Sequence, residues 1–296
     1  MRRTYREKIY SCGDYLEVQV FPVFNRGNTR RRGRSKPTSE MLARLNQKNA
    51  ERALIRLLNA NFTEKDISLT LTFRDECLPE EYDEAVRLVK NFLRRLKRLR
   101  TKLDLDEMRY IVIPGPGRFH FHIPMSGGID IKELQALWPY GYANAIYFEL
   151  DENGLEGHAR YIAKQFEEDQ FGGEDLFSML GIDEETGEVE ENSELEMRNE
   201  KLKRAKGKRR YSCSRNIIRP EAEEKDGRIS AAKVEELATF DNNSKEVFEK
   251  MYPGYAFSYC RPYYNEENGG YYLEVKMYKK DAAFLKSRKH FKKYRN

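Results

Sequence analysis

Two of the four histidines of the chain, His120 and His122, lie one residue apart in a segment rich in aromatic and branched residues. In a β-strand, residues i and i+2 project from the same face, so these imidazoles would lie side by side with Cα atoms about 6–7 Å apart. Phe119, Phe121 and Ile123 would then point into a core. Two neighbouring imidazoles are two ligands for a metal ion. The pattern predicts a metal site, with two polar residues on an amphipathic strand as the alternative.

A second group of reactive side chains lies in a helix expected over residues 156–169. His158, Tyr161 and Lys164 follow one another at three-residue spacing, which brings them to one helical face. A tyrosine hydroxyl has an ordinary pKa of about 10. A nearby ammonium or a metal-bound phosphate favours the phenolate, which is a nucleophile. Tyr161 is therefore a candidate nucleophile with Lys164 beside it, although a buried tyrosine and a solvated lysine fit the same spacing.

The elements that must position these residues form an α+β pattern. From residue 68 onward, the expected order is strand, helix, strand, strand, helix, strand, helix, which indicates a ferredoxin-like antiparallel sheet with helices on it. Pro-Gly-Pro-Gly at 114–117 marks the turn of a hairpin over 109–125 that carries the histidines. The expected strands are 68–73, 109–113, 118–125 and 143–150, and the expected helices are 38–59, 81–103, 131–138 and 156–169.

Outside this region, the sequence predicts one or two strands within 7–24, two short helices within 229–252, and a hairpin of strands at 255–264 and 270–280. The expected organisation has four parts. They are N-terminal strands and a basic arm (1–37), a central α+β domain (38–166), an acidic and then basic insertion or linker (167–210), and a small C-terminal α/β extension with a basic tail (211–296).

Charge is strongly segregated along the chain, although the net charge is only +5. Residues 167–200 contain fourteen acidic residues and one arginine. Two other segments, 26–36 and 201–210, carry basic residues and no acid. Such separated basic clusters favour a nucleic-acid partner. The residues expected to contact phosphates are Arg30, Arg31, Arg32, Arg34, Lys208, Arg209 and Arg210. The outer face of helix 81–103 is also basic, and either a solvated surface or a DNA contact fits it.

Composition narrows the function classes. No run of 18 apolar residues is present, so no membrane span is expected, and the N-terminus lacks the apolar core of a secretory signal. The four cysteines are widely spaced, as in a protein of the reducing cytoplasm. No GxxxxGK[ST] sequence is present, so an unwinding motor would be a separate protein. A polymeric substrate is expected in place of a small molecule.

Three segments in order resemble the HUH endonucleases, and within them the rolling-circle replication initiators of bacterial phages, plasmids and integrative elements. These segments are Ser68–Phe73, Arg118–Ile123 with its histidine pair, and Ala159–Lys164 with its tyrosine. The similarity extends over about residues 38–220. It implies that His120 and His122 hold a divalent ion and that Tyr161 attacks a DNA phosphate, with Lys164 nearby. The products would be a 5′-phosphotyrosine and a free 3′-hydroxyl. The implied partners are single-stranded or hairpin origin DNA and a helicase and polymerase of the host or element.

Two departures from the family pattern concern the site. The strand before the histidines, Arg109–Ile113, lacks the acid found in many relatives, so the third metal ligand stays open among Asp75, Glu76 and His158. The position of a second tyrosine is occupied by Gln165, which implies a single-tyrosine enzyme. The resemblance favours Mg²⁺ or Mn²⁺ as the ion.

Other functions fit the same residues. A transposase or a conjugative relaxase would use the same constellation. A ferredoxin-like module that binds RNA or DNA without catalysis would leave the histidines and Tyr161 as surface residues.

Overall fold

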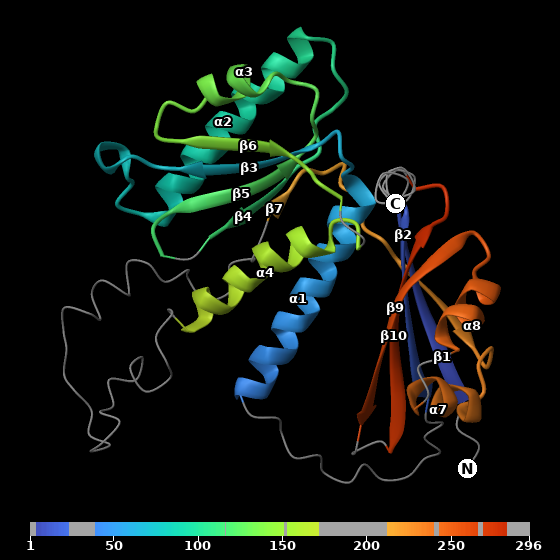
Figure 1. Cartoon of the computed structure of the whole chain (residues 1–296). Helices are drawn as coiled ribbons and strands as arrows, with labels where there is room; N and C mark the ends of the chain where they lie inside the picture. Colours follow the sequence, from blue (N-terminus) through green and yellow to red (C-terminus); the bar gives the residue numbers. More distant parts are fainter. Residues whose placement is uncertain are drawn as a thin grey trace, which may run out of the picture. The chain divides into compact units, whose positions relative to one another are not determined.

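The computed structural model describes residues 4–23, 39–115, 117–150, 153–171, 212–239, 243–265 and 269–282, with the backbone alone at 39–47 and 164–171. In this part the chain is an α+β protein with two five-stranded antiparallel sheets and six α-helices (Figure 1). None of the described helices combines the length and apolar character needed to cross a membrane.

The chain divides into two compact units, and three separate segments build the first. Unit 1 comprises Met1–Asn61, Leu150–Gly157 and Ile218–Asn296, and unit 2 comprises Phe62–Glu149 and His158–Ile217. This division differs from the expected one. The helix expected to open the domain at 38–166 groups instead with the N-terminal strands and the C-terminal segment, because its arginines pair with acids of their sheet.

The sheet of unit 2 has the strand order β6-β3-β5-β4-β7 and is antiparallel throughout. Its strands are β3 (Ile67–Thr72), β4 (Ile111–Pro114), β5 (His120–Met125), β6 (Ala143–Tyr147) and β7 (Ser212–Cys213). The hairpin expected over 109–125 forms as the pair β4 and β5. The short strand β7 was not expected. It pairs with β4, and Ser214, the residue after β7, accepts a hydrogen bond from the Tyr110 N–H at 3.1 Å.

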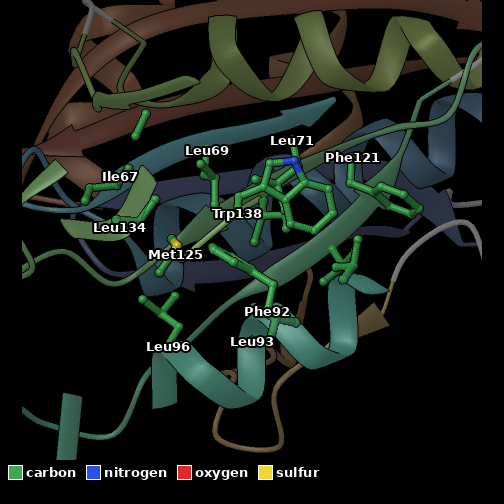
Figure 2. Close-up of a cluster of buried hydrophobic side chains, with 14 of the residues drawn as sticks. Ile67, Leu69, Leu71, Phe92, Leu93, Leu96, Phe121, Met125, Leu134 and Trp138 are labelled. Atoms are coloured by element: carbon green, nitrogen blue, oxygen red, sulfur yellow. The ribbon is translucent and has the colours of Figure 1, made fainter. Parts of the chain in front are cut away.

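One face of this sheet holds the core of unit 2. Helices α2 (Tyr82–Lys102) and α3 (Ile131–Ala136) cover that face, and Asp130 caps α3 by accepting from the Lys132 and Glu133 amides. Figure 2 shows Phe92, Leu93 and Leu96 of α2 directed into the cluster that contains Leu69 and Phe121 of the strands.

The single tryptophan belongs to this core. Trp138 is 3% exposed and donates its indole N–H to the Thr72 carbonyl at 2.8 Å. It packs edge-on against Phe73 and Phe92. Trp138 is thus a core residue of unit 2, and its fluorescence reports the packing of this unit.

Alternation along β3 leaves the opposite face of the sheet polar. Leu69, Leu71 and Phe73 enter the core, while Ser68, Thr70 and Thr72 project from the other face. Helix α4 (Glu156–Phe171) begins in unit 1, and its part from His158 onward covers this polar face in unit 2. Ala159, Ile162 and Ala163 are its buried residues in that part.

Unit 1 contains the sheet β8-β1-β2-β10-β9. Its strands are β1 (Thr4–Cys12), β2 (Tyr15–Val23), β8 (Ala222–Asp226), β9 (Tyr255–Asn265) and β10 (Gly270–Lys279). Helices α7 (Ala231–Thr239) and α8 (Ser244–Met251) supply Val234, Leu237 and Phe248 to a core on one face. The two strands within 7–24, the two short helices and the C-terminal hairpin match the expectation, while β8 was not expected.

Ion pairs fill the other face of the unit 1 sheet, where helix α1 (Ser39–Asn61) packs. Arg56 of α1 pairs with Glu17 of β2, and Arg52 pairs with Glu274 of β10 at 2.7 Å. Lys276, 1% exposed, pairs with Glu156 at 2.7 Å. Buried charges are tolerated only when paired, so removal of one partner would leave an uncompensated buried charge. This explains why α1 belongs to unit 1.

Candidate active site

The backbone register of unit 2 arranges the polar face of the sheet in rows. Thr70 of β3 lies opposite His122 of β5, and His122 lies opposite Ile113 of β4. The next row pairs Thr72 with His120. The two histidines therefore project from one face, as the sequence predicts, and their ring centroids are 5.1 Å apart with planes at 86°.

His120 has one ring nitrogen available to a ligand. Its Nδ1 lies 2.9 Å from the carbonyl oxygen of Arg118. A carbonyl can only accept a hydrogen bond, so Nδ1 carries the proton and Nε2 keeps its lone pair. A hydrogen bond on the far nitrogen is how proteins orient histidine ligands of metals. The half-buried His120 is thus oriented so that the lone pair of Nε2 can coordinate a metal ion.

The other histidine, His122, lies two residues further along the same strand, β5. His122 is buried, and its Nδ1 lies 3.2 Å from the Thr70 hydroxyl. A hydroxyl can donate or accept, so this contact orients the ring for either tautomer. Thr70 was not among the predicted site residues. Its place beside His122 depends on the β3–β5 register, which the alternation of threonines along the strand does not specify.

Helix α4 brings the candidate nucleophile to the same histidine. The ring centroid of Tyr161 lies 6.4 Å from that of His122, with the planes at 84°. Tyr161 is 64% exposed and is one of five exposed aromatic side chains among the described residues. Helix α4 and strand β5 therefore bring Tyr161 and His122 close together in unit 2.

One turn earlier in α4, His158 faces the same side of the sheet. Its Nε2 lies 2.9 Å from the Ser68 hydroxyl, and its ring packs edge-on against Phe148 at 5.0 Å. Burial lowers the pKa of His158 below the ordinary value for histidine, because burial penalises the charged form. His158 thus favours the neutral state and anchors α4 on β3.

Not every predicted member of the site is in place. Within the described residues, no three side chains of histidine, cysteine, aspartate or glutamate gather closely enough to hold a metal ion. Of the three candidates for a third ligand, His158 is bonded to Ser68 and Asp75 pairs with Arg118 at 2.6 Å. Among the described side chains, the two imidazoles are therefore the groups at this place that could hold an ion.

The side chain of Lys164 lies outside the described part of the chain, and its backbone continues α4 one turn beyond Tyr161. The predicted phosphate contacts also lie outside the described residues. These are Arg30, Arg31, Arg32, Arg34, Lys208, Arg209 and Arg210.

Gly115 is a site residue that the sequence marks only as part of a turn. Its N–H donates to the His120 carbonyl at 2.9 Å, so it continues the His120 row on the next strand. A Cβ atom at this position would lie 1.9 Å from His120 Nε2. The tip of the imidazole thus fills the space that any side chain at residue 115 would take.

Substitution of Gly115 by alanine should displace the His120 ring. Because the obstructed group is the end of a side chain, we expect little loss of stability, shifted His120 imidazole resonances in NMR spectra, and Mn²⁺ affinity reduced roughly tenfold to a hundredfold in calorimetry. Gly254→Ala is the matched control, since a Cβ there meets open space. Unchanged His120 resonances and Mn²⁺ affinity would contradict this role.

The lowered pKa of His158 predicts a pH-dependent stability. The unfolded chain has a histidine pKa near about 6.5 and the folded one a lower value, so below pH 6.5 the unfolded state binds more protons. Unfolding of unit 2, followed by Trp138 fluorescence, should become easier as the pH falls from 6.5 toward 5. His158→Gln keeps a hydrogen-bonding group and should lose that part of the slope. An identical slope in the variant would refute the assignment.

The sequence was compared with protein-family models, curated proteins and solved structures. None of the three comparisons gave a match. A functional assignment therefore rests on the geometry of the residues themselves: an imidazole pair on one sheet face with the exposed Tyr161 of α4 close to His122.

Proposed function

We propose that the chain is a site-specific single-strand DNA nickase of the HUH type that uses one tyrosine, Tyr161. The observation that carries this proposal is the approach of the exposed Tyr161 ring to His122, 6.4 Å between centroids, beside the second imidazole of the pair. A core tyrosine would be buried, and a tyrosine without a partner site would have no reason to adjoin two oriented imidazoles.

The reaction is a transfer of a phosphodiester from one oxygen to another. The Tyr161 oxygen bonds to phosphorus while the bond from phosphorus to the 3′ oxygen breaks. The phenol proton passes to solvent, and the departing 3′ oxygen takes up a proton. The products are a 5′-phosphotyrosine and a free 3′-hydroxyl that can prime synthesis. The stored ester makes the step reversible, because a 3′-hydroxyl can attack it and rejoin a strand.

His120 and His122 would hold a divalent cation, Mg²⁺ or Mn²⁺, through their Nε2 atoms, since both Nδ1 atoms have contacts within the unit. When bound, the ion supplies Lewis-acid stabilisation of the charge on the scissile phosphate. Thr70 and the Arg118 carbonyl keep the imidazoles oriented. Ser68 holds His158, and thereby the helix that carries Tyr161, against β3. Lys164 would lie near the phosphate.

The order of the elements supports the same proposal. Numbered from β3, the first four strands of the unit 2 sheet lie in the order 4-1-3-2, with α2 and α3 as crossovers on one face. A ferredoxin-like arrangement has two such split βαβ units, with the helices of both units on one face of the sheet. In unit 2 the opposite face carries the histidines.

The substrate would be single-stranded or hairpin origin DNA. The basic segments at 26–36 and 201–210 would add phosphate contacts, and binding would weaken steeply with salt. Unwinding and synthesis would fall to a helicase and a polymerase of the host or element. A rolling-circle replication initiator is the role that joins these features.

Label transfer tests the nucleophile. A random single-stranded DNA library labelled at the 3′ end is incubated with the full chain and Mn²⁺ or Mg²⁺, and the protein is examined on a denaturing gel. The label should move to the wild-type protein and be lost in Tyr161→Phe. Tyr142→Phe is the matched control, because Tyr142 is an exposed tyrosine of the same sheet face. It should retain the transfer.

His120→Ala and His122→Ala should retain folding and lower the metal-dependent transfer. Transfer that survives Tyr161→Phe would overturn the proposed nucleophile. Binding of the library with no transfer under either metal would instead favour a binding module without catalysis.

A further inference from the structure

Helix α2 carries eight cationic side chains, and four of them are used within unit 2. Arg100 is 5% exposed and donates to the Asp106 and Gly127 carbonyls, while burial lowers its pKa. Arg95 donates to the Leu137 carbonyl and the Tyr140 hydroxyl. Two more form exposed ion pairs, Arg87 with Glu84 and Lys97 with Glu107.

The other four cations form a single row, called here the α2 stripe: Lys90, Arg94, Arg98 and Lys102. All four are exposed. They follow one another at intervals of four residues, about 6 Å of helical rise with a turn of about 40° at each step, so the stripe is about 18 Å long. Within the part of the chain that the structure describes, no ion pair joins any of them to an acid.

This arrangement opposes helix stability. Like charges four residues apart on a helix repel one another, and the stripe contains three such pairs in succession. The other four cations of α2 each contact a carbonyl, a hydroxyl or an acid of the unit. The stripe residues serve neither the core nor an internal network, since the buried residues of α2 lie on its other side.

We propose that the α2 stripe binds the phosphate backbone of double-stranded DNA. Charge favours a polyanion, and a fixed row on a rigid helix suits the regular phosphates of a duplex. At about 3.4 Å per base pair, the stripe would extend along roughly five base pairs.

The surroundings of the stripe argue against a single strand as its ligand. Surfaces that bind single strands combine positive charge with aromatic side chains on which bases stack. Among the described residues, the exposed tyrosines are Tyr142, Tyr147, Tyr161, Tyr263 and Tyr264, and none lies on α2. A surface of cations without stacking groups is typical of contacts to duplex backbone, which position the protein without reading sequence.

The stripe also lies on the opposite side of the unit 2 sheet from the histidines. Helix α2 packs on the face that contains Leu69 and Phe121, whereas Tyr161 and His158 pack on the other face. A duplex on the stripe would thus be held apart from the strand to be cut. That the duplex is DNA rests on the proposed function. That the stripe binds a duplex is independent of the proposed function.

A pair of double variants tests the stripe. Arg94→Gln with Arg98→Gln removes two stripe charges, and Arg87→Gln with Lys97→Gln removes two exposed charges that are already paired. All four substitutions lie on the surface of α2, and glutamine has a helix propensity close to that of arginine and lysine. The probe is a blunt 20-base-pair DNA duplex, and its affinity for the full chain is followed by anisotropy over a range of NaCl concentrations.

The stripe variant should reduce the slope of log K against log salt by about 1.8 and the affinity about sixtyfold at 0.1 M salt, since each phosphate contact contributes about 0.9 to that slope. The control pair should stay near the wild-type slope. Equal losses in both variants, or no change in the stripe variant, would overturn the proposal. Trp138 fluorescence melting confirms that both variants are folded.

Label transfer from short single strands distinguishes the two proposals. The stripe variant should form the Tyr161 adduct at the wild-type level, because α2 lies away from the histidine face. Loss of duplex binding with intact adduct formation supports the stripe on its own. Duplex binding that depends on the stripe in a protein without adduct formation would support the stripe and refute the nickase.

Discussion

The pairing of β3 with β5 is the constraint on which the candidate site depends. It sets Thr70 opposite His122 and Thr72 opposite His120. It also places Leu69 and Leu71 beside Ile123 and Phe121 in the core. A shift of one residue would send the histidines into the core and the leucines to solvent, so burial of the apolar face holds the register. The same hydrophobic core that stabilises unit 2 therefore orients its reactive side chains.

Local patterns of the sequence were sufficient for much of the site. The alternation around His120 and His122 specified their shared face, and helical spacing brought His158 and Tyr161 to one side of α4. These local patterns could not supply contacts set by pairing across strands, such as the hydroxyl of Thr70 beside His122 and the close approach of His120 to Gly115. Unit 1 was unforeseeable for a similar reason. It unites three distant segments through ion pairs such as Arg52 with Glu274 and Lys276 with Glu156, and no local pattern encodes such partners.

The two faces of the unit 2 sheet differ in chemistry because the strands alternate. One face is apolar and is covered by α2 and α3, which makes it a rigid support. The other face carries hydroxyls and imidazoles under the part of α4 that bears Tyr161. Catalytic groups held by strands and helices are more accurately placed than groups on loops. The outer surface of α2 adds a charged surface that lies apart from the face with the imidazoles.

Peptide mapping of the covalent complex tests the central claim most directly. After reaction with single-stranded DNA, nuclease trimming and trypsin, Tyr161 should be recovered in the four-residue peptide 161–164, which contains no other tyrosine. The account predicts a nucleotide mass on that peptide, and only when Mg²⁺ or Mn²⁺ is present. Tyr142 falls in the separate peptide 133–160. A nucleotide on that peptide, or cleaved DNA without any modified peptide, would contradict the assignment of Tyr161 as the nucleophile.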